Sequence, residues 1–206
     1  MKSILITGGT GFIGSHTCLV LLEKNYDLIV IDSNVNSSEK SLLKIKNILK
    51  DKIINFDERL LFMKGDLRDE DFLRNVFSKA KDIDKEIFAV IHFAGLKAAG
   101  ESVKNPLLYW DFNLVGSLCL LKIMQENKCN TIVFSSSATI YGLSNEKLLI
   151  ESSQIKPNNP YGNTKAAIEV LLDDIFKSTD KTWRIANLRY FNPIGAHCSG
   201  LIGEDP

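Results

Sequence analysis

Short apolar runs alternate along the chain with longer segments whose apolar residues recur every three or four positions. The short runs are rich in Ile, Val, Leu and Phe, which is typical of strands buried on both faces of a parallel sheet. The pattern predicts strands at 3–7, 27–31, 60–64, 88–93, 131–135 and 184–189, and helices near 12–24, 40–50, 69–80, 106–126 and 161–178. This alternation predicts an α/β fold, a Rossmann-like doubly wound parallel sheet with helices on both faces.

Composition narrows the class of protein without identifying a function. The 206 residues include 25 basic and 25 acidic side chains, which argues against the basic surface of a nucleic-acid-binding protein. Four cysteines without CxxC spacing favour reduced thiols over disulfides or a metal site. No signal-peptide pattern opens the sequence, and its uninterrupted apolar runs are shorter than the ~18 residues of a membrane span. We therefore expect a cytoplasmic protein with neither membrane nor nucleic-acid partners.

A glycine-rich turn follows the first predicted strand. Gly8, Gly9, Gly11 and Gly14 fit both G-x-G-x-x-G and G-x-x-G-x-x-G. Glycine permits the tight turn, the close approach of backbone to a pyrophosphate and the packing of helix on strand. The helix N-terminus that follows offers free N–H groups and a partial positive charge to phosphates. Turns are glycine-rich for steric reasons too, but this position in the first strand–helix unit favours a dinucleotide site.

Two aspartates follow the second and third predicted strands. Asp32 is placed to accept hydrogen bonds from the adenosine ribose hydroxyls, although a surface aspartate is also common after a strand. It would repel a 2′-phosphate, and Ser33 and Asn34 offer no cation to hold one, so NAD is favoured over NADP. Asp66 is either an acceptor for the adenine amino group or an ordinary turn residue.

Ser137, Tyr161 and Lys165 form the candidate reaction centre. Ser137 follows the fifth predicted strand, and the i, i+4 spacing of Tyr161 and Lys165 places them on one helix face. A free tyrosine titrates near ~10, and a neighbouring ammonium group and a nicotinamide cation would both lower the pKa of its phenol. By itself Tyr-x-x-x-Lys is usually a chance helical pair. After a dinucleotide turn and a strand-end serine, the pair predicts a general base with its supporting cation.

These residues resemble the extended short-chain dehydrogenase/reductases and, among them, the UDP-glucose 4-epimerase family. The resemblance covers residues 1–206 and is carried by TGGTGFIGSH (7–16), HFAGLKAAGES (92–102), FSSSATIYG (134–142), NPYGNTKAAIE (159–169) and LRYFNPIGAH (188–197). It implies that NAD stays bound while Tyr161 takes the proton of a sugar 4-hydroxyl. The 4-keto sugar then rotates about its link to the diphosphate and takes the hydride back on its other face. By the same resemblance Ser137 orients the 4-oxygen and Lys165 bridges the nicotinamide ribose hydroxyls.

The resemblance also maps further contacts onto this chain. Asn192 corresponds to a sugar-nucleotide contact of the family, beside Ser137 and Tyr161. Three of the cofactor positions have other readings: Lys97 as a solvated charge, Asn113 as a neutral surface site, although a buried polar contact is favoured there, and Phe191 as part of the core. The family's cofactor contacts map onto Gly8, Gly11, Phe12, Ile13, Gly14, Asp32, Ser33, Asn34, Val35, Asn36, Ser37, Asp66, Leu67, Phe93, Ala94, Gly95, Leu96, Lys97, Asn113, Ser137, Tyr161, Lys165 and Phe191.

Domain organisation and assembly are expected from the same resemblance. We expect residues 1–192 to form an NAD-binding Rossmann domain and residues 193–206 to begin a C-terminal substrate-binding part that is missing. Helices 106–126 and 161–178 correspond to the four-helix contact of a homodimer, although covering the sheet explains much of their apolar pattern.

The expected substrate is a UDP-sugar, UDP-glucose or UDP-galactose, and three other readings remain. Epimerases of UDP-glucuronate or UDP-xylose remain open, because the sugar C6 end would touch the missing C-terminal part, and an inactive NAD-binding fragment would retain the fold. A nucleotide-sugar 4,6-dehydratase fits less well, because Ala138 and Thr139 stand where that family carries an Asp-Glu pair.

Overall fold

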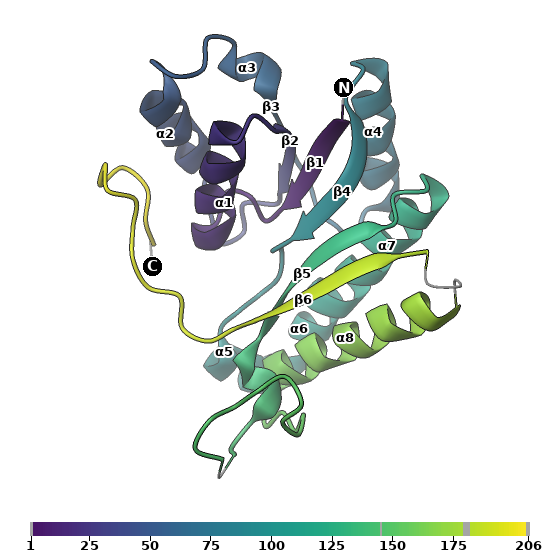
Figure 1. Cartoon of the computed structure of the whole chain (residues 1–206). Helices are drawn as coiled ribbons and strands as arrows, with labels where there is room; N and C mark the ends of the chain where they lie inside the picture. Colours follow the sequence, from purple (N-terminus) through teal and green to yellow (C-terminus); the bar gives the residue numbers. More distant parts are fainter. Residues whose placement is uncertain (1, 145, 179–181, 205–206) are drawn as a thin grey trace.

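The computed structural model describes residues 2–144, 146–178 and 182–204. In this part of the chain, six parallel strands form one sheet in the order β3-β2-β1-β4-β5-β6 (Figure 1). This is the order of a doubly wound dinucleotide-binding sheet, so the predicted fold class is confirmed. The strands are β1 (Lys2–Thr7), β2 (Asp27–Asp32), β3 (Leu60–Lys64), β4 (Glu86–His92), β5 (Thr131–Ser137) and β6 (Arg184–Tyr190).

Helices cover both faces of the sheet, and each face has its own apolar cluster. Leu5 of β1 packs into one cluster with side chains of the helices that follow β3, β4 and β5, whereas Ile4 and Ile6 pack into the other with side chains of the first two helices. Alternate residues of a strand point to opposite faces, which is why an uninterrupted apolar strand serves both clusters. The helices are α1 (Phe12–Glu23), α2 (Lys40–Leu49), α3 (Phe56–Arg59), α4 (Glu70–Asp82), α5 (Ala99–Lys104), α6 (Pro106–Tyr109), α7 (Gly116–Glu126) and α8 (Pro160–Ser178).

The predicted helix at 106–126 is continuous but contains a π-helical segment, η1 (Trp110–Val115), between α6 and α7. By length and composition, Pro106–Glu126 is apolar enough to cross a membrane, with a mean hydropathy of 1.4 over the best window. Half of that window is buried inside the protein, and the side chain of Asn113 at its centre is hydrogen-bonded to neighbouring segments. These contacts are those of a core helix that covers the sheet.

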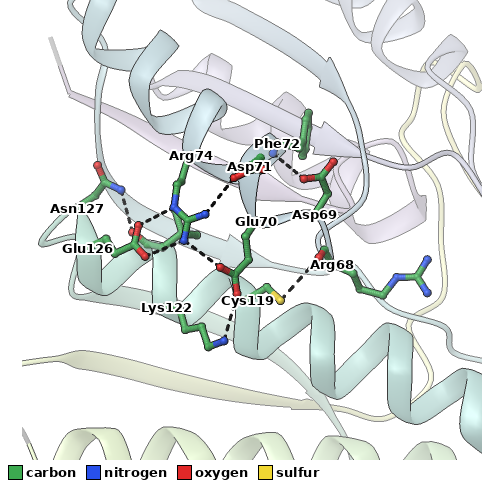
Figure 2. Close-up of polar contacts among 11 residues, drawn as sticks. Arg68, Asp69, Glu70, Asp71, Phe72, Arg74, Cys119, Lys122, Glu126 and Asn127 are labelled. Atoms are coloured by element: carbon green, nitrogen blue, oxygen red, sulfur yellow. Dashed lines mark hydrogen bonds and ion pairs between the residues drawn. The ribbon is translucent and has the colours of Figure 1, made fainter.

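An exposed ion-pair network joins α4 to α7 (Figure 2). Arg74 bonds Glu70 and Asp71 of its own helix and Glu126 of α7, while Lys122 of α7 reaches back to Glu70. Each pair is largely solvated, so the network contributes little to the stability of the fold. The apolar residues beneath the network hold these two helices on the sheet.

The segment after β6 runs back past α1 (Figure 1). Phe191 is 62% exposed, so its alternative reading as a core residue is wrong. Residues 193–196 and the first turns of α1 line a surface groove of about 500 Å³. Ile202 is buried in the cluster with α1 and α2, which fastens the end of the described chain to the first strand–helix units.

Candidate active site

The glycine turn lies between the end of β1 and α1, and two of its glycines are sterically required. Gly8 has a φ of +68°, and a Cβ there would lie 2.6 Å from the backbone nitrogen of Ala94. A Cβ on Gly14 would lie 2.2 Å from the carbonyl oxygen of Gly8. A Cβ on Gly11, by contrast, would have only one neighbour within 4 Å, the carbonyl oxygen of Gly8 at 3.4 Å, so there is room beside Gly11. The first turn of α1 carries no acidic residue and no side-chain cap, as an anion-binding helix start requires.

Asp32 ends β2 and braces the glycine turn. Its carboxylate accepts hydrogen bonds from the backbone N–H of Thr10 at 3.1 Å, the N–H of Asn34 at 2.9 Å and the hydroxyl of Ser37 at 3.0 Å. The Thr10 hydroxyl in turn donates to the side-chain carbonyl of Asn34. The predicted ribose-binding residues therefore lie against the predicted phosphate turn. Ser33 lies beside them, whereas Val35 and Asn36 are exposed.

The ends of β3 and β4 complete this edge of the sheet. Asp66 bonds the side chain of Arg68, which holds the pKa of the Asp66 carboxyl below its ordinary value. The carboxylate also accepts the N–H of Arg68, so it is a turn residue in this structure, and an adenine contact stays a prediction. Leu67 is half-buried beside it. After β4, the N–H of Phe93 donates to the carbonyl of Thr7, which sets Phe93 and Ala94 against the glycine turn.

Asn113 holds the loop after β4 against α8. Its side chain accepts the N–H of Leu96 at 2.8 Å and donates to the carbonyl of Leu96 and the hydroxyl of Thr164, both at 3.1 Å. This confirms Asn113 as a buried polar contact, and the π-helical segment that contains it was not predicted. Gly95 passes so close that a Cβ would lie 3.0 Å from the Asn113 amide oxygen. Lys97 is exposed and pairs with Glu204 at 2.9 Å.

Ser137, Tyr161 and Lys165 come together where β5 meets α8. The Lys165 Nζ donates to the carbonyl of Ser135 at 2.9 Å and lies 5.9 Å from the centroid of the Tyr161 ring. The Ser137 hydroxyl donates to the Thr139 hydroxyl at 2.9 Å and is close enough to Tyr161 to act on the pKa of its phenol. The three residues therefore lie together, as the strand-end position and the i, i+4 spacing predict. Phe191 and Asn192, which follow β6, are exposed.

Protonation of this centre differs from the expectation. Burial raises the pKa of the Tyr161 phenol above its ordinary value, against a smaller lowering by the hydrogen bond from Ser137. Burial also lowers the pKa of Lys165 from 10.5 to about 8. The expected lowering of the phenol pKa by Lys165 is wrong for the chain alone, because desolvation acts on both groups and the ammonium is directed at Ser135.

A family model described as GDP-mannose 4,6 dehydratase matches residues 5–204. The chain belongs to that family. The family model is named for a dehydratase, whereas the similar curated proteins are named as epimerases. UDP-glucose 4-epimerase 2 of Arabidopsis thaliana is 50% identical over the whole chain. A bifunctional UDP-glucose and UDP-xylose 4-epimerase of Pisum sativum is 45% identical, also over the whole chain.

Solved structures agree with these relatives. The UDP-glucose 4-epimerase of Bifidobacterium longum, in complex with NAD+ and UDP, matches all of this chain and 58% of its own with a TM-score of 0.89 and 44% identity. An enzyme from Stenotrophomonas maltophila with bound NAD and formylated UDP-arabinopyranose matches all of this chain and 57% of its own, with a TM-score of 0.88 and 39% identity. This member of the GDP-mannose 4,6 dehydratase family spans about half the length of the curated relatives, 56% for the Arabidopsis protein.

Several residues that shape the site were not among the sequence predictions. Thr10 ties the glycine turn to Asp32, and the Ser102 hydroxyl accepts the N–H of Tyr161 at 3.2 Å, at the start of α8. Glu169 and Arg189 form a buried ion pair beneath the reaction centre. Each lies in or beside a motif carrying the family resemblance, but nothing in the spacing of these side chains indicates which partner they find.

Proposed function

We propose that this chain carries the NAD-binding and proton-transfer part of a UDP-hexose 4-epimerase acting on UDP-glucose and UDP-galactose through a transient 4-keto sugar. The observation that carries the proposal is the grouping of Ser137, Tyr161 and Lys165 at the same sheet edge as the glycine turn. A simple binding protein needs the turn but none of these three side chains. The names of the similar proteins support the same reaction.

The residues present fit NAD. The turn leaves room beside Gly11, where a pyrophosphate could approach the backbone, and α1 adds its partial positive charge. Asp32 disfavours a 2′-phosphate, and among the described residues from 33 to 39 there is no cation to offset it. Lys165 is buried and its Nζ bonds a backbone carbonyl instead of a carboxylate, so it is placed to meet ribose hydroxyls. When bound, NAD supplies reversible two-electron oxidation at a sugar carbon.

Proton transfer is the task of the chain's own side chains. Tyr161 is placed to accept the proton of the sugar 4-hydroxyl, and Ser137 can hydrogen-bond the same oxygen. The pKa of the Tyr161 phenol stands above its ordinary value before any ligand binds. A positive charge delivered to this site would lower it, so base strength and cofactor binding are coupled.

UDP-xylose and UDP-glucuronate are the alternative substrates. The bifunctional Pisum sativum relative is named for activity on UDP-xylose as well as UDP-glucose, and the groups that would meet the sugar C6 are not defined by residues 2–204. A 4,6-dehydratase reaction is less well supported, since Ala138 and Thr139 in η2 (Ala138–Tyr141) supply no carboxylate.

We also propose a homodimer in the cytoplasm, joined through the helices 106–126 and 161–178. Exposed apolar side chains support this contact: Leu107 is 83% exposed on α6 and Val170 is 61% exposed on α8, which packs beside it. Large exposed apolar residues on adjacent helices are typical of a surface that meets a partner.

The test is a pair of measurements on the same preparation. Calorimetric titration with NAD measures cofactor binding, and the absorbance of reduced nicotinamide after addition of UDP-galactose, UDP-xylose or UDP-glucuronate measures sugar oxidation. We expect NAD to bind and UDP-galactose to give the largest signal. Absence of NAD binding would contradict the proposal, and a larger signal with another sugar would change the substrate.

A further inference from the structure

Glu169 and Arg189 form a buried ion pair between α8 and β6. Arg189 donates from Nη2 to Glu169 Oε2 at 2.7 Å and from Nε to Oε1 at 3.1 Å. The side chains are only 7% and 19% exposed. Glu169 lies one helical turn beyond Lys165 and two turns beyond Tyr161, so its carboxylate belongs to the helix that carries the candidate base.

The pair also reaches the strand that carries Ser137. The hydroxyl of Ser136 donates to Glu169 Oε1 at 2.5 Å. Arg189 is the register partner of Ser136 across β5 and β6, and the next pair along is Ser137 with Tyr190. One carboxylate thus connects α8 to β5 and β6 immediately beside the reaction centre.

Arg189 extends this connection to the loop after η2. Its Nη1 donates to the hydroxyl of Tyr141 at 2.9 Å and to the carbonyl of Glu151 at 2.8 Å. Tyr141 is itself buried, and its ring lies 5.3 Å from the guanidinium carbon. A lysine could not make these divergent bonds together with the bidentate contact to Glu169, because the planar guanidinium alone offers them in a fixed geometry.

Stability alone is a weak reason for such a pair. Desolvating two charges offsets much of their attraction, and apolar residues of similar size often replace a buried pair without loss of stability. What the pair does supply is a fixed position of α8 along its axis relative to β5 and β6. A shift of α8 by one residue moves its side chains by about 1.5 Å along the helix axis, comparable to the margin within which a hydrogen bond is made or lost.

We propose that Glu169 and Arg189 are a positioning pair that holds the Tyr161–Lys165 face of α8 in register with Ser137 of β5. The inference rests on the proposed function, because it assigns that site its supporting contacts. The pair touches none of the reacting atoms and acts through Ser136, Tyr161 and Lys165.

A change in nearby charge and a shift in the position of α8 move the pKa of the Tyr161 phenol in opposite directions, which makes the proposal testable. Glu169→Gln removes a negative charge and leaves Arg189 uncompensated, so electrostatics alone lowers the pKa of the phenol. Loss of register moves Tyr161 away from the Ser137 side chain, whose proximity lowers the pKa of the phenol, so the pKa rises. Tyr161 faces Lys165 of its own helix and Tyr109 of α6, whose hydroxyl donates to Glu101, and the variants change none of these groups.

Arg189→Lys separates the two effects further. It keeps the positive charge but loses the bidentate contact and the bonds to Tyr141 and Glu151, so a purely electrostatic role leaves the phenol pKa unchanged. The matched control is Asp173→Asn, which removes a carboxylate from the exposed pair Asp173–Lys177 of the same helix. Ultraviolet titration of each protein, minus the same protein carrying Tyr161→Phe, isolates the Tyr161 phenol from the other tyrosines.

We expect the phenol pKa to rise in both Glu169→Gln and Arg189→Lys and to stay unchanged in Asp173→Asn. A fall in Glu169→Gln, or no change in Arg189→Lys in a folded protein, would overturn the positioning role. The titration uses the chain without cofactor, so its result does not depend on whether the chain epimerises a sugar. In a second measurement, reduction of bound NAD by UDP-galactose should slow about tenfold in both variants, as for a misplaced base. Loss of this reaction in every protein, wild type included, would count against the proposed function and not against the pair.

Discussion

The Nζ atom of Lys165 donates a hydrogen bond to the backbone carbonyl of Ser135, 30 residues earlier in the chain. This contact places a buried amine at the end of β5, two residues before Ser137. The Nζ also lies 4.8 Å from the centroid of the Phe134 ring, whose face favours a cation. These two interactions only partly replace the water lost on burial, since the pKa of Lys165 still falls to about 8.

The lowered pKa predicts that the contribution of Lys165 to the stability of the folded protein rises as the solution becomes alkaline. Between about pH 8 and pH 10.5 the unfolded chain holds a proton on Lys165 that the folded chain has released, so this contribution to the free energy of unfolding rises with pH. The gain over this window is of the order of 3 kcal/mol, because each pH unit corresponds to about 1.4 kcal/mol. Urea unfolding of the wild type and of Lys165→Met, compared at several pH values, measures it as the difference between the two proteins.

The exposed Lys177 provides the control for this measurement. Asp173 raises the pKa of Lys177 above its ordinary 10.5, so this lysine keeps its proton in both states over most of the same range, and the difference between the wild type and Lys177→Met should stay nearly constant and fall only above about pH 10.5. A difference between the wild type and Lys165→Met that stays constant from pH 8 to pH 10.5 would show that Lys165 is not desolvated as described.

The sequence predicted those features that depend on local pattern. All six strands were located within about two residues, because strands buried on both faces are nearly unbroken apolar runs. The glycine turn and the Tyr161–Lys165 pair could also be predicted from the sequence, because the first lies within one turn and the second on one face of a single helix. His92, in one of these apolar runs, is a buried core residue whose ring nitrogens are bonded to Thr7 and Ser117.

Features that depend on long-range partners were not predicted. The helix α5 is too short to show a periodicity, and the π-helical segment around Asn113 follows from contacts with Leu96 and Thr164 that no spacing reveals. In the chain without a cofactor, the direction of the Tyr161 pKa differs from the expectation for a related reason. Burial of the phenol depends on how α6 and α8 pack, with the ring of Tyr109 lying 6.5 Å from that of Tyr161.

Asp32 predicts a preference for NAD over NADP. Its carboxylate is already oriented by Thr10, Asn34 and Ser37, so a 2′-phosphate entering beside it meets a fixed negative charge. We expect NAD to bind at least about tenfold more tightly, which is ~1.4 kcal/mol. Parallel calorimetric titrations with the two dinucleotides test this, and equal or tighter binding of NADP would refute it.

Replacement of Asp32 should affect more than cofactor choice. Asp32→Ser removes the acceptor for the N–H of Thr10, so the glycine turn loses a brace as well as a ribose contact. We expect weaker NAD binding together with a smaller preference over NADP. Ser41→Ala is the matched control, because the Ser41 hydroxyl bonds the carbonyl of the same Thr10 without contributing a charge; it should leave the ratio of the two affinities unchanged.

Tyr161→Phe tests the assignment of the base. The substitution removes the hydroxyl beside Ser137 but leaves the ring packed against Tyr109, so NAD binding should change little. Oxidation of UDP-galactose by bound NAD should fall by about 10²-fold or more, as expected for loss of a general base. Tyr190→Phe, which changes another partly buried tyrosine, provides the comparison. Near-normal oxidation in Tyr161→Phe would require a different base.

The proposed homodimer predicts which surface substitutions dissociate it. Leu107 and Val170 lie on α6 and α8, two helices that pack on each other, and both side chains are largely exposed in the single chain. A charge at the centre of an apolar interface costs about 2 kcal/mol or more, which weakens a dimer about thirtyfold. Leu107→Glu and Val170→Glu should therefore shift the sedimentation of the protein towards the monomer at micromolar concentration.

Leu148 is 82% exposed but lies in the loop between η2 and α8, so Leu148→Glu makes a similar change in charge and apolar surface away from these helices. If Leu148→Glu dissociates the protein as strongly as the two helix variants do, or if the wild type sediments as a monomer, then these helices do not form the contact.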